Sequence, residues 1–175
     1  EMGHAFQGYS SRHQPMSDLV WPTTEACEIH SMALEFLTWP HMDKFYGEEA
    51  AEQLRRVHLI DHLLFLPYGV SIDHFQHLVY ENPGATSEER NAMWQEMEET
   101  YLPWYDYADL PAENSGRLWQ QKQHLYTSPF YYIDYCLAQN GALQFWSQSR
   151  PDPTAAMKAD ATLCALGGSK SYTGL

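Results

Sequence analysis

The segment T-E-A-C-E-I-H-S-M-A-L-E-F-L-T-W (residues 24–39) carries the clearest helical signal in the chain and determines the expected fold class. A threonine able to cap a helix stands at its start, Glu25 follows, and Pro40 comes directly after it. Apolar side chains recur along one side of the segment, as in a helix that packs against a core. They are Ile29, Met32, Leu34 and Phe36.

Helical patterns continue outward from this segment. We expect helices at residues 48–66, 69–80, 86–101, 130–148 and 153–166. Pro67 should end the first of them, and Pro129 fits a first helical position. Residues 104–115 lack periodicity and predict an ordered loop, and no segment alternates convincingly enough for a strand. The expected fold class is mainly α, in a single helical domain over residues 1–175.

Composition excludes several classes of partner. The chain has 175 residues, of which 44% are hydrophobic, so it can bury a core. Its net charge of −13 and only ten Lys and Arg argue against nucleic acid binding, which needs clustered cations. No apolar run approaches the ~18 residues of a membrane span, and we see no signal peptide. Three widely spaced cysteines fit a reducing compartment, so the predicted location is cytoplasmic.

The first catalytic candidates are Glu1 and His4. In the zincin motif H-E-x-x-H, two histidines on one helix face bind Zn²⁺, and the glutamate between them acts as general base. The tetrapeptide E-M-G-H at residues 1–4 corresponds to the last four positions of that motif. On its own this match is weak, because a surface glutamate and histidine on a helix look the same.

A third candidate ligand is Glu28, on the predicted helix over residues 24–39. Glutamate-type zincins complete their ligand set with a carboxylate on a second helix. Glu25 lies one turn before Glu28, and Glu35 two turns after it on the same face. Burying a carboxylate on a mostly apolar helix is costly unless it has a partner, and a metal ion can be that partner. The simpler interpretation is an acidic helix face exposed to solvent.

His124 and the tyrosines after it are candidates for stabilising an oxyanion. Tyr131 and Tyr135 are four residues apart, and Tyr132 and Tyr135 three, so either pair can share a helix face. Hydroxyl and imidazole donors aimed at a developing oxyanion contribute a few kcal/mol to catalysis. In most proteins such a cluster belongs to the core, and both interpretations stay open.

Several long blocks of the chain resemble the M3 metallopeptidases, in the branch of oligoendopeptidase F and the Pz-peptidases. The resemblance covers nearly the whole chain and is more specific than the zinc motif alone. Its blocks include E-M-G-H-A-F-Q (1–7), W-P-T-T-E-A-C-E-I-H-S-M (21–32), L-L-F-L-P-Y-G-V (63–70), F-Q-H-L-V-Y-E-N-P (75–83), Y-L-P-W-Y-D-Y (101–107), S-P-F-Y-Y-I-D-Y (128–135) and G-G-S-K (167–170).

The resemblance implies the C-terminal part of a zincin-type helical oligopeptidase catalytic domain, beginning inside the H-E-x-x-H helix. It also implies roles for individual residues. Glu1 is the general base, His4 and Glu28 are zinc ligands, and Glu35 is an acid that supports them. His124 and Tyr135, with Tyr132 or Tyr131, polarise the substrate carbonyl. We expect Glu25, one turn before Glu28, to support the ligands as well. Distant relatives favour Tyr132, whereas helical spacing from His124 favours Tyr131. The loop at residues 104–116 would face the cleft.

The implied function is zinc-dependent hydrolysis of short oligopeptides, with one Zn²⁺ per intact active site. The N-terminal half of the same peptidase is an implied partner. The first histidine ligand would precede residue 1, so we expect weak zinc binding and negligible activity from these 175 residues alone, and self-association is possible. The alternative is a non-catalytic helical module, derived from a peptidase, that binds a peptide or partner. For the other histidines, including the His58–His62 pair, ordinary polar roles suffice.

Overall fold

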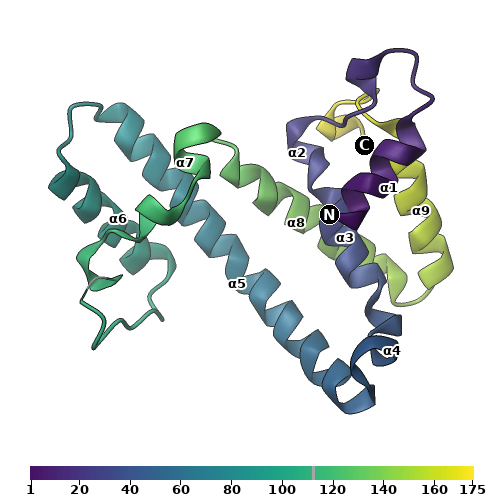
Figure 1. Cartoon of the computed structure of the whole chain (residues 1–175), viewed down its shortest axis with the longest axis horizontal. Helices are drawn as coiled ribbons and strands as arrows, with labels where there is room; N and C mark the ends of the chain where they lie inside the picture. Colours follow the sequence, from purple (N-terminus) through teal and green to yellow (C-terminus); the bar gives the residue numbers. More distant parts are fainter. Residues whose placement is uncertain (112) are drawn as a thin grey trace. The chain divides into compact units, whose positions relative to one another are not determined.

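The computed structural model describes residues 1–111 and 113–175, and within these ranges the regular structure is entirely helical. The predicted mainly α fold class is therefore confirmed (Figure 1). The chain groups into two compact units, one formed by Glu1–His62 with Leu137–Leu175 and the other by Leu63–Cys136. We call them the terminal unit and the central unit. The single-domain expectation stays a prediction.

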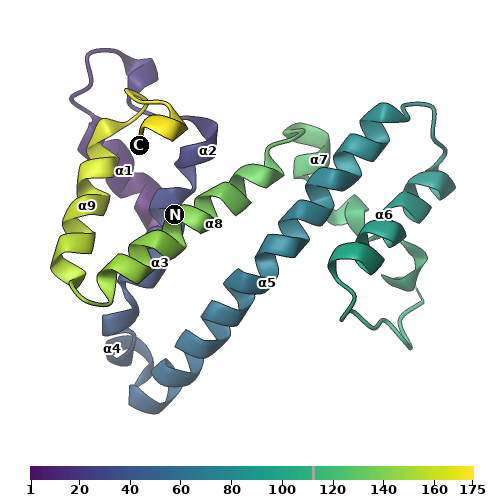
Figure 2. The same ribbon diagram turned by 180° about the vertical axis from the view of Figure 1, so that it is seen from behind.

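The terminal unit contains helices from both ends of the chain. Helix α1 packs against α3 and α9, and α3 also contacts α9 (Figure 2). Its complete helices are α1 (Met2–Ser11), α2 (Thr24–Cys27), α3 (Ile29–Leu37), α4 (Asp43–Tyr46) and α9 (Pro153–Leu166), with 3₁₀ turns at Ser17–Leu19, Trp39–His41 and Tyr172–Gly174.

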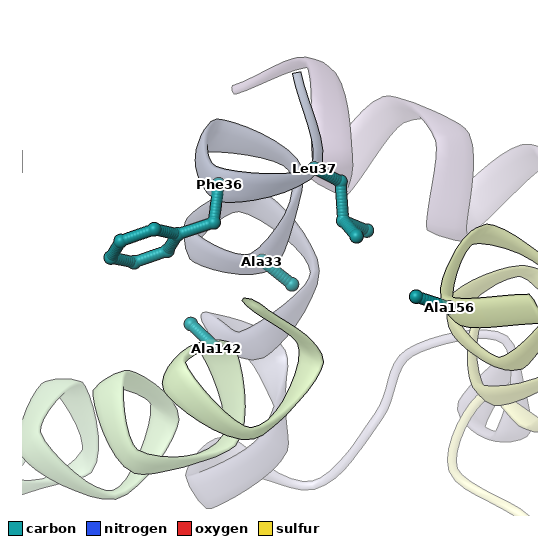
Figure 3. Packing of buried hydrophobic residues seen from close by; sticks show 5 residues of the cluster. All are labelled: Ala33, Phe36, Leu37, Ala142 and Ala156. Carbon is teal, nitrogen blue, oxygen red and sulfur yellow. The ribbon is translucent and has the colours of Figure 1, made fainter. Parts of the chain in front are cut away.

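Small and aromatic side chains form the core of the terminal unit. Ala33, Phe36 and Leu37 of α3 pack with Ala142 of α8 and Ala156 of α9 (Figure 3). Phe36 is only 1% exposed and the three alanines at most 1%, so the helix backbones approach one another closely. Of the four apolar residues predicted to face a core, Phe36 and Met32 pack in this cluster and Ile29 in a neighbouring one, whereas Leu34 belongs to neither.

The central unit is built on the second part of α5 (Glu48–Glu81) and the first residues of α8 (Tyr132–Ser149). Its core holds Ile72, Phe75, Trp94, Met97 and Tyr132. The remaining elements are α6 (Ser87–Tyr101), α7 (His124–Thr127) and 3₁₀ turns at Glu113–Ser115 and Leu118–Gln121. Among the described helices, none combines the length and apolar character needed to cross a membrane.

The helix expected over residues 24–39 is interrupted at Glu28, between α2 and α3. The thiol of Cys27 donates to the carbonyl of Thr24 at 3.0 Å, and this carbonyl is the acceptor that Glu28 would use in a continuous helix. The Glu28 N–H instead reaches the carbonyl of Ala26. Glu28 therefore stands at a helix junction rather than in a helix interior.

Pro67 does not end a helix, contrary to the expectation from sequence. It lies inside α5, which runs without interruption from residue 48 to residue 81. A proline removes the hydrogen bond to the carbonyl four residues earlier, which here belongs to Leu63. Leu63 is 49% exposed, so this turn of α5 borders solvent.

The expected start of a helix at Pro129 is also wrong, because α8 begins at Tyr132. Phe130 has a φ of 63°, outside the right-handed helical region. Its N–H donates to the side-chain oxygen of Gln76 at 2.7 Å, which holds this turn against α5. The predicted loop over residues 104–115 is confirmed apart from its short 3₁₀ turn, although Ala112 lies outside the described residues.

Candidate functional site

The structure brings His4 and Glu28 together. Nε2 of His4 lies 3.1 Å from Oε2 of Glu28, and the two side chains are 30% and 15% exposed. His4 is on the first turn of α1, and Glu28 is at the junction of α2 and α3. A nitrogen and a carboxylate oxygen thus meet at a point that solvent can still reach.

The close approach of α1 to α3 explains how these two side chains meet. Gly3 is buried, and a Cβ at this position would overlap the backbone of His30 and Ser31. The N–H of His4 donates to the hydroxyl oxygen of Ser31 at 3.1 Å, which fixes the first turn of α1 against α3. Only glycine at position 3 allows this contact.

His30 is a neighbour that the sequence analysis did not single out. It is 2% exposed, and Nδ1 lies 3.2 Å from Sγ of Cys164 on α9. Burial, together with the nearby charge of His4, lowers the pKa of His30 to about 4. His30 is therefore neutral near pH ~7. The only signal in the sequence was its place on a largely apolar helix.

Two further candidate residues, Glu1 and Glu25, lie at the starts of α1 and α2. Glu1 is exposed and occupies the N-cap position of α1 without a side-chain capping bond, and its carbonyl accepts the N–H of Ala5 at 3.2 Å. Residues 1 and 4 are one helical turn apart, so their side chains leave neighbouring points of one face. Glu25 lies in the first turn of α2 and is partly buried.

Glu35 pairs with two histidines of α5. Its Oε2 lies 2.8 Å from Nε2 of His58 and 3.1 Å from Nε2 of His62. Hydrogen bonds from these imidazoles lower the pKa of Glu35 to about 2, against the opposing effect of burial. Ordinary polar roles were expected for the His58–His62 pair, and its pairing with Glu35 was not predicted from the sequence.

His124 and the predicted tyrosines gather in the central unit. Nε2 of His124 lies 3.2 Å from the hydroxyl of Tyr135, and its ring stacks on Tyr131 with centroids 6.1 Å apart. Tyr132 is only 8% exposed and belongs to the core, and burial, with smaller effects from Tyr68, raises its pKa. The cluster therefore contains partly accessible donors, Tyr131 and Tyr135, and one buried tyrosine.

Comparison with known proteins identifies a family. The chain matches the profile of Peptidase family M3 over residues 1–174. No curated protein sequence matches it.

Three solved structures are similar over 99% of the chain. One is described as an oligoendopeptidase F, with 54% identity and a TM-score of 0.95 over 30% of its own length. The second is PZ peptidase A with an inhibitor, with 52% identity and a TM-score of 0.95 over 31% of its length. The third, described as an oligoendopeptidase F from Bacillus anthracis strain Ames, has 48% identity and a TM-score of 0.81 over 27% of its length.

Proposed function

Because the chain belongs to peptidase family M3, we propose that it is the metal-binding part of a zinc endopeptidase that hydrolyses short oligopeptides. The observation that carries this proposal is the 3.1 Å separation of His4 Nε2 and Glu28 Oε2. Catalytic zinc sites use histidine nitrogen and carboxylate oxygen as ligands and leave a position open for water.

The donor atoms fit Zn²⁺. Ligand atoms around a tetrahedral zinc ion are ~3.4 Å apart, the edge of a tetrahedron with bonds of ~2.1 Å. The 3.1 Å separation of the His4 and Glu28 atoms is close to that edge. The H-E-x-x-H pattern supplies its first histidine from the position before Glu1, so we propose that residue as the third ligand.

Glu1 is the proposed general base. When bound, Zn²⁺ polarises the peptide carbonyl and lowers the pKa of water towards ~7. The carboxylate of Glu1 then takes the proton from the attacking water and passes it to the leaving amine. Its position one helical turn before His4, and its exposure to solvent, support this role.

His124 and Tyr135 are the proposed donors to the carbonyl oxygen. Their side chains lie 3.2 Å apart, and both are partly exposed. Imidazole N–H and phenol O–H groups can stabilise the charge that develops on this oxygen. Tyr131 and Tyr132 stay alternative second tyrosines: Tyr131 stacks on His124, and Tyr132 is the more buried of the two.

The family supports proposals for the substrates and the partner, and the spacing of the cysteines supports one for the location. The chain spans about 30% of the length of the solved relatives, so we propose that the remaining part of the same peptidase completes the cleft. We propose that the substrates are oligopeptides and that the protein is cytoplasmic. We also propose that Glu25 and Glu35 support the metal ligands. The 175 residues alone should bind zinc weakly at the His4–Glu28 pair and lack activity.

A substitution of the proposed base tests the function in the whole peptidase. Glu1→Gln should keep the bound zinc and reduce peptide hydrolysis by at least about a thousandfold, because the carboxamide cannot accept the proton. Glu49→Gln, an exposed carboxylate in the first turn of α5, is the matched control and should retain activity. Wild-type hydrolysis by Glu1→Gln would overturn the assignment of the base.

The non-catalytic alternative makes the opposite prediction. It requires a residue other than histidine before Glu1, and a wild-type protein that binds peptides without cleaving them. Determining that residue from the gene separates the two hypotheses before any assay.

A further inference from the structure

Glu35, His58 and His62 bring three metal-ligand atoms to one point in the terminal unit. Oε2 of Glu35 lies 2.8 Å and 3.1 Å from the two Nε2 atoms, which are 3.0 Å from each other. His58 and His62 are one turn apart on α5, and Glu35 comes from α3. Two histidines at this spacing with a carboxylate from another helix repeat the donor set of a zinc site.

The three separations are compatible with a shared ion as well as with hydrogen bonds. If both Nε2 atoms carried protons, two N–H groups would oppose each other across 3.0 Å. At least one imidazole therefore offers a lone pair to the centre of the cluster. The three separations of 2.8–3.1 Å lie slightly inside the ~3.4 Å edge of tetrahedral zinc, so a small outward rotation of the rings admits an ion.

The surroundings already orient both rings. The ring of Phe36, itself only 1% exposed, lies with its centroid 4.9 Å from His58 and 4.8 Å from His62. The side-chain oxygen of Gln139 pairs with Nδ1 of His62. An amide oxygen accepts, so the His62 proton is on Nδ1 and the lone pair of neutral His62 is on Nε2, as metal-ligating histidines require.

Trp39 favours the tautomer of His58 that cannot bind a metal through Nε2. Its indole N–H donates to Nδ1 of His58 at 3.2 Å, so the proton of neutral His58 is on Nε2. For Nε2 to bind an ion, this proton must move to Nδ1 and the bond from the indole must be given up. Trp39 should therefore weaken metal binding at this cluster.

We propose that Glu35, His58 and His62 form a binding site for a divalent transition ion of the zinc type. The side chains are 52%, 21% and 13% exposed, so an ion can enter from solvent and keep water as a further ligand. Neither His4 nor Glu28 is one of the three ligands. Glu35 is also proposed above to support that pair, so the test is made with His4 and Glu28 replaced and measures zinc binding rather than peptide hydrolysis.

A calorimetric titration with zinc tests the proposal. It uses the whole chain with His4→Gln and Glu28→Gln, so that the His4–Glu28 pair cannot bind the ion. This background should bind one equivalent of Zn²⁺. Glu35→Gln and His62→Gln should each weaken the affinity by about a hundredfold or more, because each removes a direct ligand. Gln139→Met should weaken it by about tenfold, as expected for the partner that orients a ligand. Trp39→Phe should strengthen it.

His77→Gln is the matched control. His77 is an exposed histidine of the same helix, outside the cluster, and its replacement should leave the affinity unchanged. The proposal fails if Glu35→Gln and His62→Gln bind zinc as tightly as their background, with circular dichroism showing that each is folded. It also fails if the His4→Gln, Glu28→Gln chain is folded and binds no zinc.

Discussion

Gly3 rests directly on the backbone of His30, and this contact brings α1 close enough to α3 for His4 to reach Glu28. A Cβ at position 3 has no free space, since the carbonyl of His30 and Cα of Ser31 occupy it. The pairing of His4 with Glu28 therefore depends on a residue that carries no functional group.

Gly3→Ala should lower the free energy of unfolding by about 2 kcal/mol, because the new methyl group forces α1 away from α3. Urea denaturation measures the change. Gly8→Ala is the control in the same helix, since its added Cβ would meet only a Trp21 side-chain atom at 3.9 Å. That variant should gain about 0.5 kcal/mol from helix propensity. Equal stability of the two variants would contradict the close packing at Gly3.

His4→Gln in the whole peptidase should weaken zinc binding by at least about a hundredfold, more than the 10–100-fold typical for loss of a supporting residue. Equilibrium dialysis against zinc gives the affinity. His13→Gln, an exposed histidine just beyond α1, should bind zinc as the wild type does. Unchanged zinc affinity in His4→Gln would remove His4 from the ligand set.

The carboxyl group of Asp160 should make the stability of the wild type depend on pH, whereas the amide of Asp160→Asn does not titrate. The carboxyl is 2% exposed, and Oδ1 has no hydrogen-bond partner among the described residues, so burial raises its pKa from 3.8 to about 6. A carboxyl group whose pKa is higher in the folded chain than in the unfolded chain stabilises the fold in full at a pH below its unfolded-state pKa. This stabilisation is lost as the pH rises through the folded-state pKa. Between about pH 4 and pH 7 the wild type should lose about 2–3 kcal/mol relative to Asp160→Asn.

Urea midpoints of the two proteins across this range give the difference directly, since all other groups titrate alike in both. A difference between wild type and Asp160→Asn that stays constant across this pH range would show that Asp160 is solvated in the folded chain.

Thr86→Ala should lower stability by about 1 kcal/mol. Thr86 caps α6 by accepting the N–H of Glu89 at 3.2 Å, while the Glu89 carboxylate accepts the N–H of Thr86 at 2.7 Å. Thr100→Ala, at an exposed site near the end of the same helix, should change stability by a few tenths of a kcal/mol at most. Thermal unfolding of the two variants measures the contrast, and equal melting temperatures would argue against the capping box.

The amino-acid sequence by itself determined the helical fold class and the helices whose ends carry local signals. The starts of α6 after Thr86 and of α9 after Asp152 follow from capping residues within one turn. Such signals act over three or four residues, so they can be recognised in a sequence. Glu1, His4 and Glu28 could likewise be selected as candidates from motif spacing and family resemblance, although their roles remain proposals.

Only the tertiary structure decided which distant side chains meet. The break at Glu28, the passage of α5 through Pro67 and the meeting of Glu35 with His58 and His62 all depend on contacts or solvent exposure that local patterns do not encode. From the sequence, Glu35 was expected to lie on the same helix face as Glu28, but in the structure it pairs with His58 and His62 of α5. Packing between helices, which sums many weak contacts over residues far apart in sequence, selects these partners.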